Sequence, residues 1–192
     1  LNSFYVPQSD AYSCGAASVS MALNALLNAD RPRSDQERNI TQEELLDKVK
    51  GDWQALLSPP GLAGRHGLTL TQLAAFMRAG FKAYSRDKFA VTLGEAGLKA
   101  FRRALVENEK DADDLILVHF AQDDLTLAEG GPYPHISPIG AYDAARKRVL
   151  IFDVDRQWYE PYWVPDEALL KAMARETAAF GRGGWVRARR DR

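Results

Sequence analysis

The sequence predicts an α+β fold in which an N-terminal helical half packs on an antiparallel sheet. Segments with apolar residues at helical spacing occupy much of residues 14–107, whereas short apolar runs typical of strands follow from residue 115. Helices followed by strands, without strict alternation, are typical of this fold class. The 192 residues are enough to bury a sizeable core, and we expect residues 1–192 to form a single domain.

Four segments in the first half are predicted to be helices. They cover residues 14–27, 41–49, 69–78 and 93–107. Ser13 precedes the first helix and is suited to an N-cap position. Thr41 and Glu44 have the spacing of a capping box, and Gly80 is expected to end the third helix.

The second half is predicted to contain strands and one further helix. We expect strands at residues 115–120, 136–142, 148–154 and 185–189, and a helix at 165–176. Residues 144–147 would connect the second strand to the third. We interpret the basic C-terminal end as a solvated tail; it contains Arg187, Arg189, Arg190 and Arg192.

Composition excludes several classes of protein. One cysteine allows neither an intramolecular disulfide nor a cysteine-based structural zinc site, and a net charge of -1 gives no general attraction to nucleic acid or anionic membranes. No stretch is apolar enough to span a bilayer, and no signal-type apolar segment opens the chain. The chain begins with Leu1 rather than Met, so we expect a periplasmic protein if a signal peptide preceded it and a cytoplasmic one otherwise.

Cys14 is the main candidate for a reactive residue. It lies where the lead-in loop becomes the first predicted helix, and a helix N-terminus presents unpaired N–H groups and a partial positive charge. This environment favours the thiolate, which is the nucleophilic form of cysteine. Gly15 leaves room for a substrate. The alternative is a small buried apolar residue, as most single cysteines are.

The sequence offers three histidines as a partner for this thiol. His119 lies inside an apolar run, and we interpret it as a satisfied core residue. His66 lies in a glycine-rich loop and is expected to be exposed. His135 begins a predicted strand, which is a rigid platform open at one end and therefore suits a general base.

Asp153 interrupts the apolar run at residues 149–154, so its carboxylate needs a partner such as a histidine N–H. If the two strands are neighbours, Asp153 would orient His135 and complete a catalytic triad with Cys14. The sequence contains no Gly-x-Ser-x-Gly elbow, P-loop, dinucleotide fingerprint or metal-type histidine pair. A metal site built from scattered histidines and carboxylates remains an open alternative.

Four segments of the chain contain distinctive motifs. Residues 8–18 place Gln8 before Cys14-Gly15-Ala16-Ala17-Ser18, and residues 135–142 read His-Ile-Ser-Pro-Ile-Gly-Ala-Tyr. Residues 151–156 read Ile-Phe-Asp-Val-Asp-Arg, and residues 161–165 read Pro-Tyr-Trp-Val-Pro. Together these segments resemble phytochelatin synthases, and the 18-residue separation of His135 and Asp153 is also that of the family. The segments follow the family's order and cover nearly the whole chain.

The resemblance implies a papain-like cysteine proteinase fold and a single catalytic domain. It implies that Cys14 is the nucleophile, His135 the general base and Asp153 the orienting carboxylate. It also implies that Gln8 forms an oxyanion hole with the Cys14 N–H, which suits an amide donor. Arg156 matches a family arginine near the acyl site; it would bind a substrate carboxylate or Asp153, or else form a structural salt bridge.

The activity that the resemblance implies is cleavage of the Cys–Gly bond of glutathione. Glycine leaves, and the acyl group passes to a second thiol peptide, giving phytochelatin, or to water. The chain looks like the short bacterial type, for which we expect hydrolysis to dominate. We expect no tightly bound cofactor, and heavy metal would enter as the thiolate complex of the substrate. A homodimer remains an open alternative.

The resemblance weakens at two places next to the expected site. Pro134 replaces the glycine that usually precedes the histidine, and residues 157–160, Gln-Trp-Tyr-Glu, replace a more basic segment. A papain-like peptidase or amidase acting on another peptide is therefore one alternative. A non-catalytic module that binds thiols, peptides or metal is another. We interpret the aromatic residues of this region as core or lid packing; they are Trp158, Tyr159, Tyr162 and Trp163.

Overall fold

The structure is a computed structural model that describes residues 1–29, 34, 37–58, 60–63, 65, 67–94, 96–178 and 180–191. Among these residues, the main sheet consists of β1 (Phe89–Leu93), β2 (Asp114–Ala121), β3 (Pro134–Asp143), β4 (Arg148–Ile151), β5 (Tyr162–Pro165) and β8 (Gly184–Arg190). The strands run antiparallel in the order β1-β8-β2-β3-β4-β5. A separate two-stranded ribbon pairs β6 (Glu176–Thr177) with β7 (Gly181–Arg182).

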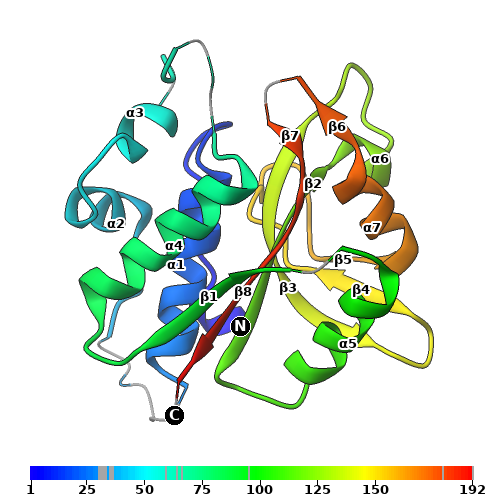
Figure 1. The fold of residues 1–192 in the computed structure, drawn as a ribbon. Helices are drawn as coiled ribbons and strands as arrows, with labels where there is room; N and C mark the ends of the chain where they lie inside the picture. Colours follow the sequence, from blue (N-terminus) through cyan, green and yellow to red (C-terminus); the bar gives the residue numbers. More distant parts are fainter. Residues whose placement is uncertain are drawn as a thin grey trace.

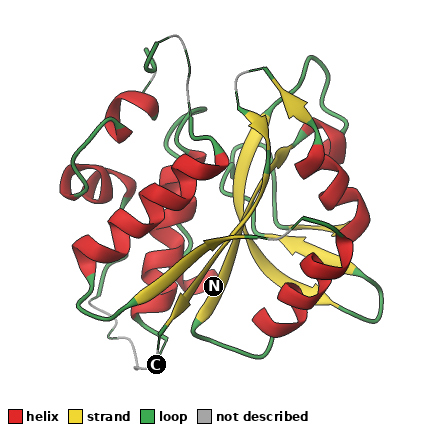
Figure 2. Ribbon diagram, viewed as in Figure 1, coloured by secondary structure: helices red, strands yellow, loops and turns green. Residues whose placement is uncertain are grey.

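Helices cover both faces of this sheet (Figure 1). A short 3-10 helix, η1 (Asn2–Phe4), precedes α1 (Cys14–Leu27), α2 (Gln42–Lys48), α3 (Trp53–Leu56) and α4 (Leu70–Tyr84) on one side. The other side carries α5 (Leu98–Asn108), α6 (Asp123–Thr126) and α7 (Asp166–Ala174). The α+β class is thus confirmed, and Figure 2 shows that helices flank the strands rather than occupying one half alone.

The first core lies between α1, α4 and the sheet. Helix α1 is nearly all buried, and its small residues leave room for neighbouring side chains: an added Cβ on Gly15 would lie 3.0 Å from Leu68 Cδ1. Gly80 lies inside α4, where an added Cβ would lie 3.1 Å from Leu23 Cδ1. The prediction that Gly80 ends the helix is therefore wrong: this glycine allows close packing on α1, and α4 continues to Tyr84. The capping box of Thr41 and Glu44 is confirmed.

Strand β1 was not predicted, and the helix expected at residues 93–107 begins only at Leu98. Within this edge strand only Val91 is buried, so the sequence carries little of the alternation that marks a strand. Gly94 follows β1, and its N–H donates to the Trp185 carbonyl at 2.8 Å. A Cβ at Gly94 would overlap the Trp185 ring, so this close approach requires glycine.

The basic C-terminal residues do not form a solvated tail, which corrects the sequence interpretation. They lie in β8, an inner strand between β1 and β2. The Arg187 guanidinium is paired with Asp114, a buried carboxylate on β2, and with Glu107. Arg190 lies near Asp113. Arg192 lies outside the described residues.

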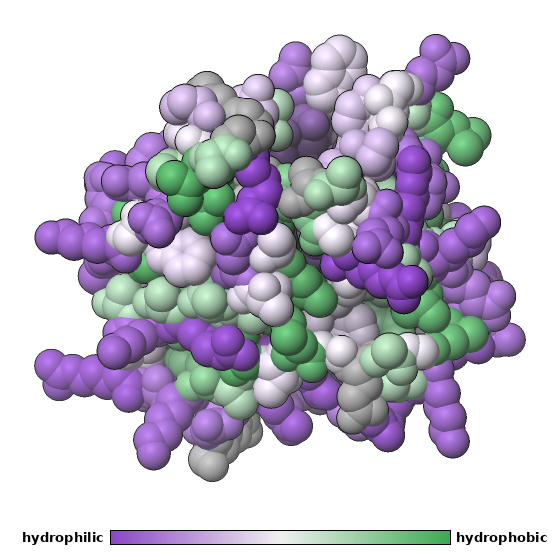
Figure 3. Space-filling view, turned by 45° about the horizontal axis from the view of Figure 1, so that its top comes forward, coloured by the Kyte–Doolittle hydropathy of each residue, from purple (hydrophilic) through white to green (hydrophobic). Residues whose placement is uncertain are grey.

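Polar side chains predominate on the face shown in Figure 3, and apolar side chains form smaller groups there. None of the described helices is both long and apolar enough to cross a membrane.

The Arg187–Asp114 pair predicts a large effect on stability. Asp114→Ala should lower the free energy of unfolding by about 3–5 kcal/mol, because it leaves a mostly buried guanidinium without its main partner. Urea denaturation measures this change. Arg146→Ala, at the exposed pair with Asp143, is the control and should leave stability nearly unchanged. Equal effects of the two substitutions would contradict the interpretation.

Candidate active site

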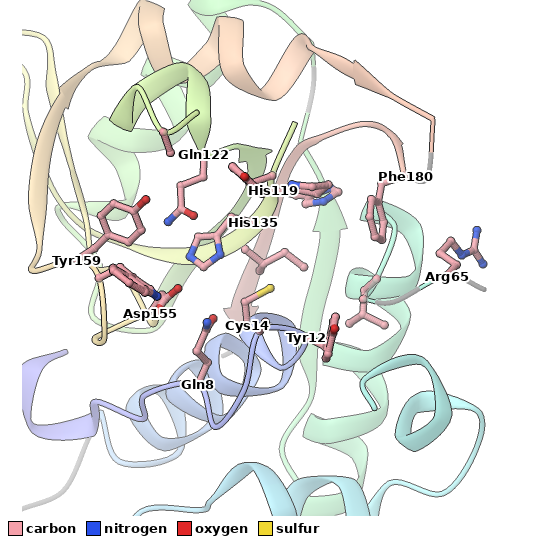
Figure 4. Close-up of a pocket in the computed structure, with 18 of the residues that line it drawn as sticks. Gln8, Tyr12, Cys14, Arg65, His119, Gln122, His135, Asp155, Tyr159 and Phe180 are labelled. Atoms are coloured by element: carbon pink, nitrogen blue, oxygen red, sulfur yellow. The ribbon is translucent and has the colours of Figure 1, made fainter. Parts of the chain in front are cut away.

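A cavity of about 810 Å³ opens at the N-terminal end of α1, beside β2 and β3. Figure 4 shows its residues converging from the lead-in loop, from α1 and from the sheet. The lining includes Gln8, Tyr12, Cys14, Leu68, His119, Gln122, His135, Asp155, Trp158, Tyr159 and Phe180. Three of the predicted site residues, Gln8, Cys14 and His135, are among them.

Cys14 is the first residue of α1, as predicted. Ser13 occupies the N-cap position, but its hydroxyl accepts from the N–H groups of Ser9 and Asp10 at 3.0 and 3.1 Å instead of capping the helix. The first turn contains no acidic residue. The positive end of the helix is therefore not neutralised locally and can stabilise negative charge on the Cys14 sulfur.

His135 and Asp153 form a buried pair. The His135 Nε2 lies 2.8 Å from Asp153 Oδ1. This contact leaves Nδ1 of the ring for the thiol, and Figure 4 shows the ring beside the Cys14 side chain. Burial alone would lower the pKa of His135, but the charge and hydrogen bond of Asp153, together with the neighbouring Cys14, outweigh burial and raise that pKa to about 10. The imidazolium is thus the stable form at neutral pH.

Asp153 receives four hydrogen bonds although it is fully buried. Besides His135, the Asp155 N–H donates to Oδ1 at 2.9 Å, and Gln122 Nε2 and the Tyr162 hydroxyl each donate to Oδ2 at 3.0 Å. Burial opposes the charge, but His135 and these donors together hold the pKa of Asp153 below its ordinary value. The carboxylate therefore stays ionised and fixed in orientation.

The sequence did not indicate Gln122 or Tyr162 as site residues. Gln122 follows β2, and Tyr162 begins β5, so the two donors come from opposite sides of the β3–β4 pair. Burial and the adjacent Asp153 raise the pKa of Tyr162, so its hydroxyl remains a donor. Residues 148–154 were predicted as one strand, but β4 ends at Ile151, and Asp153 lies in the segment beyond it.

Gln8 reaches the cavity from the lead-in loop. Its backbone N–H donates to the Val154 carbonyl at 2.8 Å, which ties this loop to the segment that carries Asp153. The side-chain Oε1 is buried and has no hydrogen-bond partner among the described residues. An oxyanion hole would use the Nε2 donor of this amide, and that role of Gln8 stays a prediction.

Arg156 is not among the residues that line the cavity. Its guanidinium lies over the Tyr5 ring, 5.7 Å from the ring centroid. None of the hydrogen bonds to the Asp153 carboxylate comes from Arg156. Contact with a substrate carboxylate thus stays a prediction that this geometry does not favour.

Some residues that the sequence predicted to be core residues line the cavity. His119 is buried, as predicted, but it lines the cavity and its Nδ1 has no partner among the described residues. Trp158 and Tyr159 line the cavity as well, and Trp158 is 72% exposed, so they are not simply core residues.

His66 lies outside the described residues. Among those described, no group of three or more His, Cys, Asp or Glu is arranged to hold a metal ion.

Comparison with known proteins decides the family. The family model for phytochelatin synthase matches residues 1–183. The chain belongs to the phytochelatin synthase family. Its helices and antiparallel sheet agree with the papain-like fold of that family's domain.

The chain is similar to several plant proteins of this family. It is 30% identical over 180 residues to glutathione gamma-glutamylcysteinyltransferase 3 of Lotus japonicus, covering 90% of this chain and 33% of that protein. It is 30% identical to glutathione gamma-glutamylcysteinyltransferase 1 of Triticum aestivum, covering 94% and 33%. It is 28% identical to glutathione gamma-glutamylcysteinyltransferase 2 of Arabidopsis thaliana, covering 95% and 37%. The chain thus spans about a third of the length of these relatives.

The two cavity histidines should titrate at opposite ends of the pH scale. We expect His135 to stay protonated up to about pH 9 and His119 to stay neutral down to about pH 5, as their shifted pKa values require. Asp153→Asn should lower the pKa of His135, because the carboxylate's charge is lost while burial remains. NMR of ¹⁵N-labelled imidazoles measures both. Titration of His135 near pH 6.5 in the unchanged protein would contradict this prediction.

The donors to Asp153 predict a second effect. Tyr162→Phe and Gln122→Leu should each destabilise the protein by about 1.5–3 kcal/mol, because each removes a hydrogen bond to a buried charge. Both should also slow alkylation of Cys14 by iodoacetamide at neutral pH, since His135 is held less firmly. Trp163→Phe, at the adjacent and partly exposed position, is the control. Unchanged stability and alkylation in Tyr162→Phe would count against this role.

Proposed function

We propose that the protein cleaves the Cys–Gly bond of glutathione through an acyl-enzyme on Cys14 and releases glycine. The observation that carries this proposal is the buried His135–Asp153 pair beside a cysteine at a helix N-terminus. Membership of the phytochelatin synthase family supports it, as do the names of the matched relatives, which are glutathione gamma-glutamylcysteinyltransferases.

In the first step, the Cys14 thiolate attacks the carbonyl carbon of the cysteinyl residue of glutathione. Negative charge develops on the carbonyl oxygen, where the Gln8 side-chain amide and the Cys14 N–H would stabilise it. The His135 imidazolium then gives its proton to the glycine nitrogen as the C–N bond breaks. Glycine leaves, and γ-glutamylcysteine remains attached to sulfur as a thioester.

In the second step, neutral His135 acts as a general base. It takes a proton from a water molecule or from the amino group of a second thiol peptide as that oxygen or nitrogen attacks the thioester, which gives the free acid or a new peptide bond. The Cys14 thiolate is the leaving group, and the proton on the imidazole restores the ion pair. Asp153 holds the ring in the same orientation through both steps, because Nε2 remains bonded to its carboxylate.

Hydrolysis is proposed to dominate over transfer. A second glutathione is a net anion, and positive charge near the acyl-enzyme would strengthen its binding. Among the described lining residues, Arg65 carries the one guanidinium or ammonium group, whereas Asp155 and Glu129 carry carboxylates. Water needs no such recognition. Heavy metal would enter as a complex with the substrate thiolate, because soft ions prefer thiolate ligands.

The acidic lining also favours a second candidate substrate. A short peptide that carries a cationic group would be attracted by Asp155 and Glu129 and would undergo the same Cys14 chemistry. A small peptide library, compared with glutathione at equal concentration, separates the two substrates. Faster cleavage of cationic peptides would replace glutathione as the substrate without changing the mechanism.

Incubation with glutathione tests the main proposal. We expect free glycine and γ-glutamylcysteine, and mass spectrometry of the protein should show a γ-glutamylcysteinyl adduct on Cys14. Cys14→Ala should abolish both, because no thioester can form. Gln8→Ala should lower kcat by roughly 100- to 1000-fold, as loss of one oxyanion-hole donor does. Absence of both turnover and adduct in the unchanged protein would refute the proposal.

A further inference from the structure

Gln42 is a buried side chain that links a helix of the core to the lead-in loop. It is the first residue of α2 and is 5% exposed, and its Nε2 donates to the Pro7 carbonyl at 2.7 Å. Its Oε1 has no hydrogen-bond partner among the described residues. Burying an amide with one atom unpaired is costly, so this arrangement adds little net stability. The main consequence of the contact lies in the group that it holds.

That group is the peptide between Pro7 and Gln8, which is held at both ends. Its carbonyl accepts from Gln42, and its N–H donates to the Val154 carbonyl at 2.8 Å. Because a peptide group is planar, one hydrogen bond at each end fixes its orientation. The Cα of Gln8 is thereby fixed as well, and Figure 4 shows the side chain extending from it into the cavity next to Cys14.

The start of α2 is itself attached firmly to α1, the neighbouring helix that begins with the nucleophile (Figure 1). Asn24 of α1 is 3% exposed; its Nδ2 donates to the Ile40 carbonyl at 3.0 Å, and its Oδ1 accepts from the Ile40 N–H at 2.8 Å. Ser20, also on α1, donates to the Thr41 carbonyl at 3.3 Å. Gln42 therefore connects the lead-in loop to the same rigid helix that carries the reactive thiol.

An oxyanion-hole donor needs such an anchor. Its donor atom must be held within about 0.5 Å of the productive position. Residues 9–11, which lie between Gln8 and the start of α1, are exposed, and exposed loops are more mobile than the elements they connect. The precision required at Gln8 thus depends on the two hydrogen bonds to its peptide group.

We propose that Gln42 is a positioning residue, which holds the Pro7–Gln8 peptide so that the Gln8 amide can donate to the oxyanion formed when Cys14 attacks. The inference rests on the proposed function, in which Gln8 supplies that donor. Gln42 is not among the residues that line the cavity, so it acts through Gln8 and not on the substrate. Its loss should weaken the transition state while leaving substrate binding unchanged.

Two substitutions of Gln42 remove its hydrogen bond in different ways. Gln42→Met keeps an unbranched side chain without a donor, and Gln42→Asn keeps the amide but is one methylene too short to reach Pro7. Both should lower kcat for glutathione roughly 10- to 100-fold with little change in KM, because only the oxyanion donor is displaced. Gln54→Met, at an exposed glutamine on α3, is the matched control and should keep the original kcat. Wild-type kcat in both Gln42 variants would overturn the proposal.

Alkylation of Cys14 separates positioning from a general disturbance of the site. Iodoacetamide reacts at a methylene carbon and forms no oxyanion, so its rate should be unchanged in Gln42→Met although kcat falls. Equal losses of alkylation and turnover would overturn the proposal.

A double-mutant cycle tests whether Gln42 acts through Gln8. In the Gln8→Ala protein the donor is already absent, so adding Gln42→Met should change kcat by less than about twofold. A further loss as large as that of Gln42→Met alone would show that the two residues act independently and would overturn the proposal.

Failure of the proposed function gives a different pattern from failure of this inference. If the unchanged protein hydrolyses p-nitrophenyl acetate but not glutathione, glutathione is the wrong substrate. The Gln42 variants are then compared on the ester, because attack by Cys14 on its carbonyl also produces an oxyanion. The same loss, with the same dependence on Gln8, is expected there. Wild-type ester hydrolysis in both Gln42 variants would overturn the role of Gln42.

Discussion

The structure of the site depends on keeping one carboxylate charged in the protein interior. Asp153 is fully inaccessible to solvent, and burial by itself would favour its protonated form. Donors from three separate segments and the His135 ring reverse this preference. The consequence extends to the ring, because an ionised Asp153 contributes to the raised pKa of His135 and so keeps the imidazole protonated at neutral pH.

A second constraint is that Cys14 and His135 come from different layers of the fold. The hydrogen bonds that link the layers include Ser18 Oγ to the Ile136 carbonyl at 2.9 Å, the Gln8 N–H to the Val154 carbonyl at 2.8 Å, and the Tyr5 hydroxyl to the Asp153 carbonyl at 2.9 Å. An added Cβ on Gly15 would lie 3.0 Å from Leu68, so the start of α1 is also tightly packed. The side chains of Cys14 and His135 are therefore held together by the core as a whole.

The reactive residues could be predicted because their signals are local in the sequence. Cys14 lies at the start of a predicted helix. His135 and Asp153 lie next to apolar runs, where an ionisable side chain is costly unless it has a partner. Gln122 and Tyr162 could not be predicted in this way, since their role exists only after the strands β2, β3 and β5 have come together. The same holds for Arg187, whose partner Asp114 lies 73 residues away and whose basic neighbours suggested a tail.

The buried polar groups around the cavity differ in whether the protein supplies their hydrogen-bond partners. Every oxygen of the Asp153 carboxylate is used by the protein itself, which suits a group whose task is to stay still during the reaction. Gln8 Oε1 and His119 Nδ1 are equally inaccessible, yet neither has a partner among the described residues. Both side chains border the space next to Cys14. An unpaired polar atom in a protein interior costs free energy, so the wall of the cavity that holds Cys14 is less stable than a fully paired or apolar wall would be.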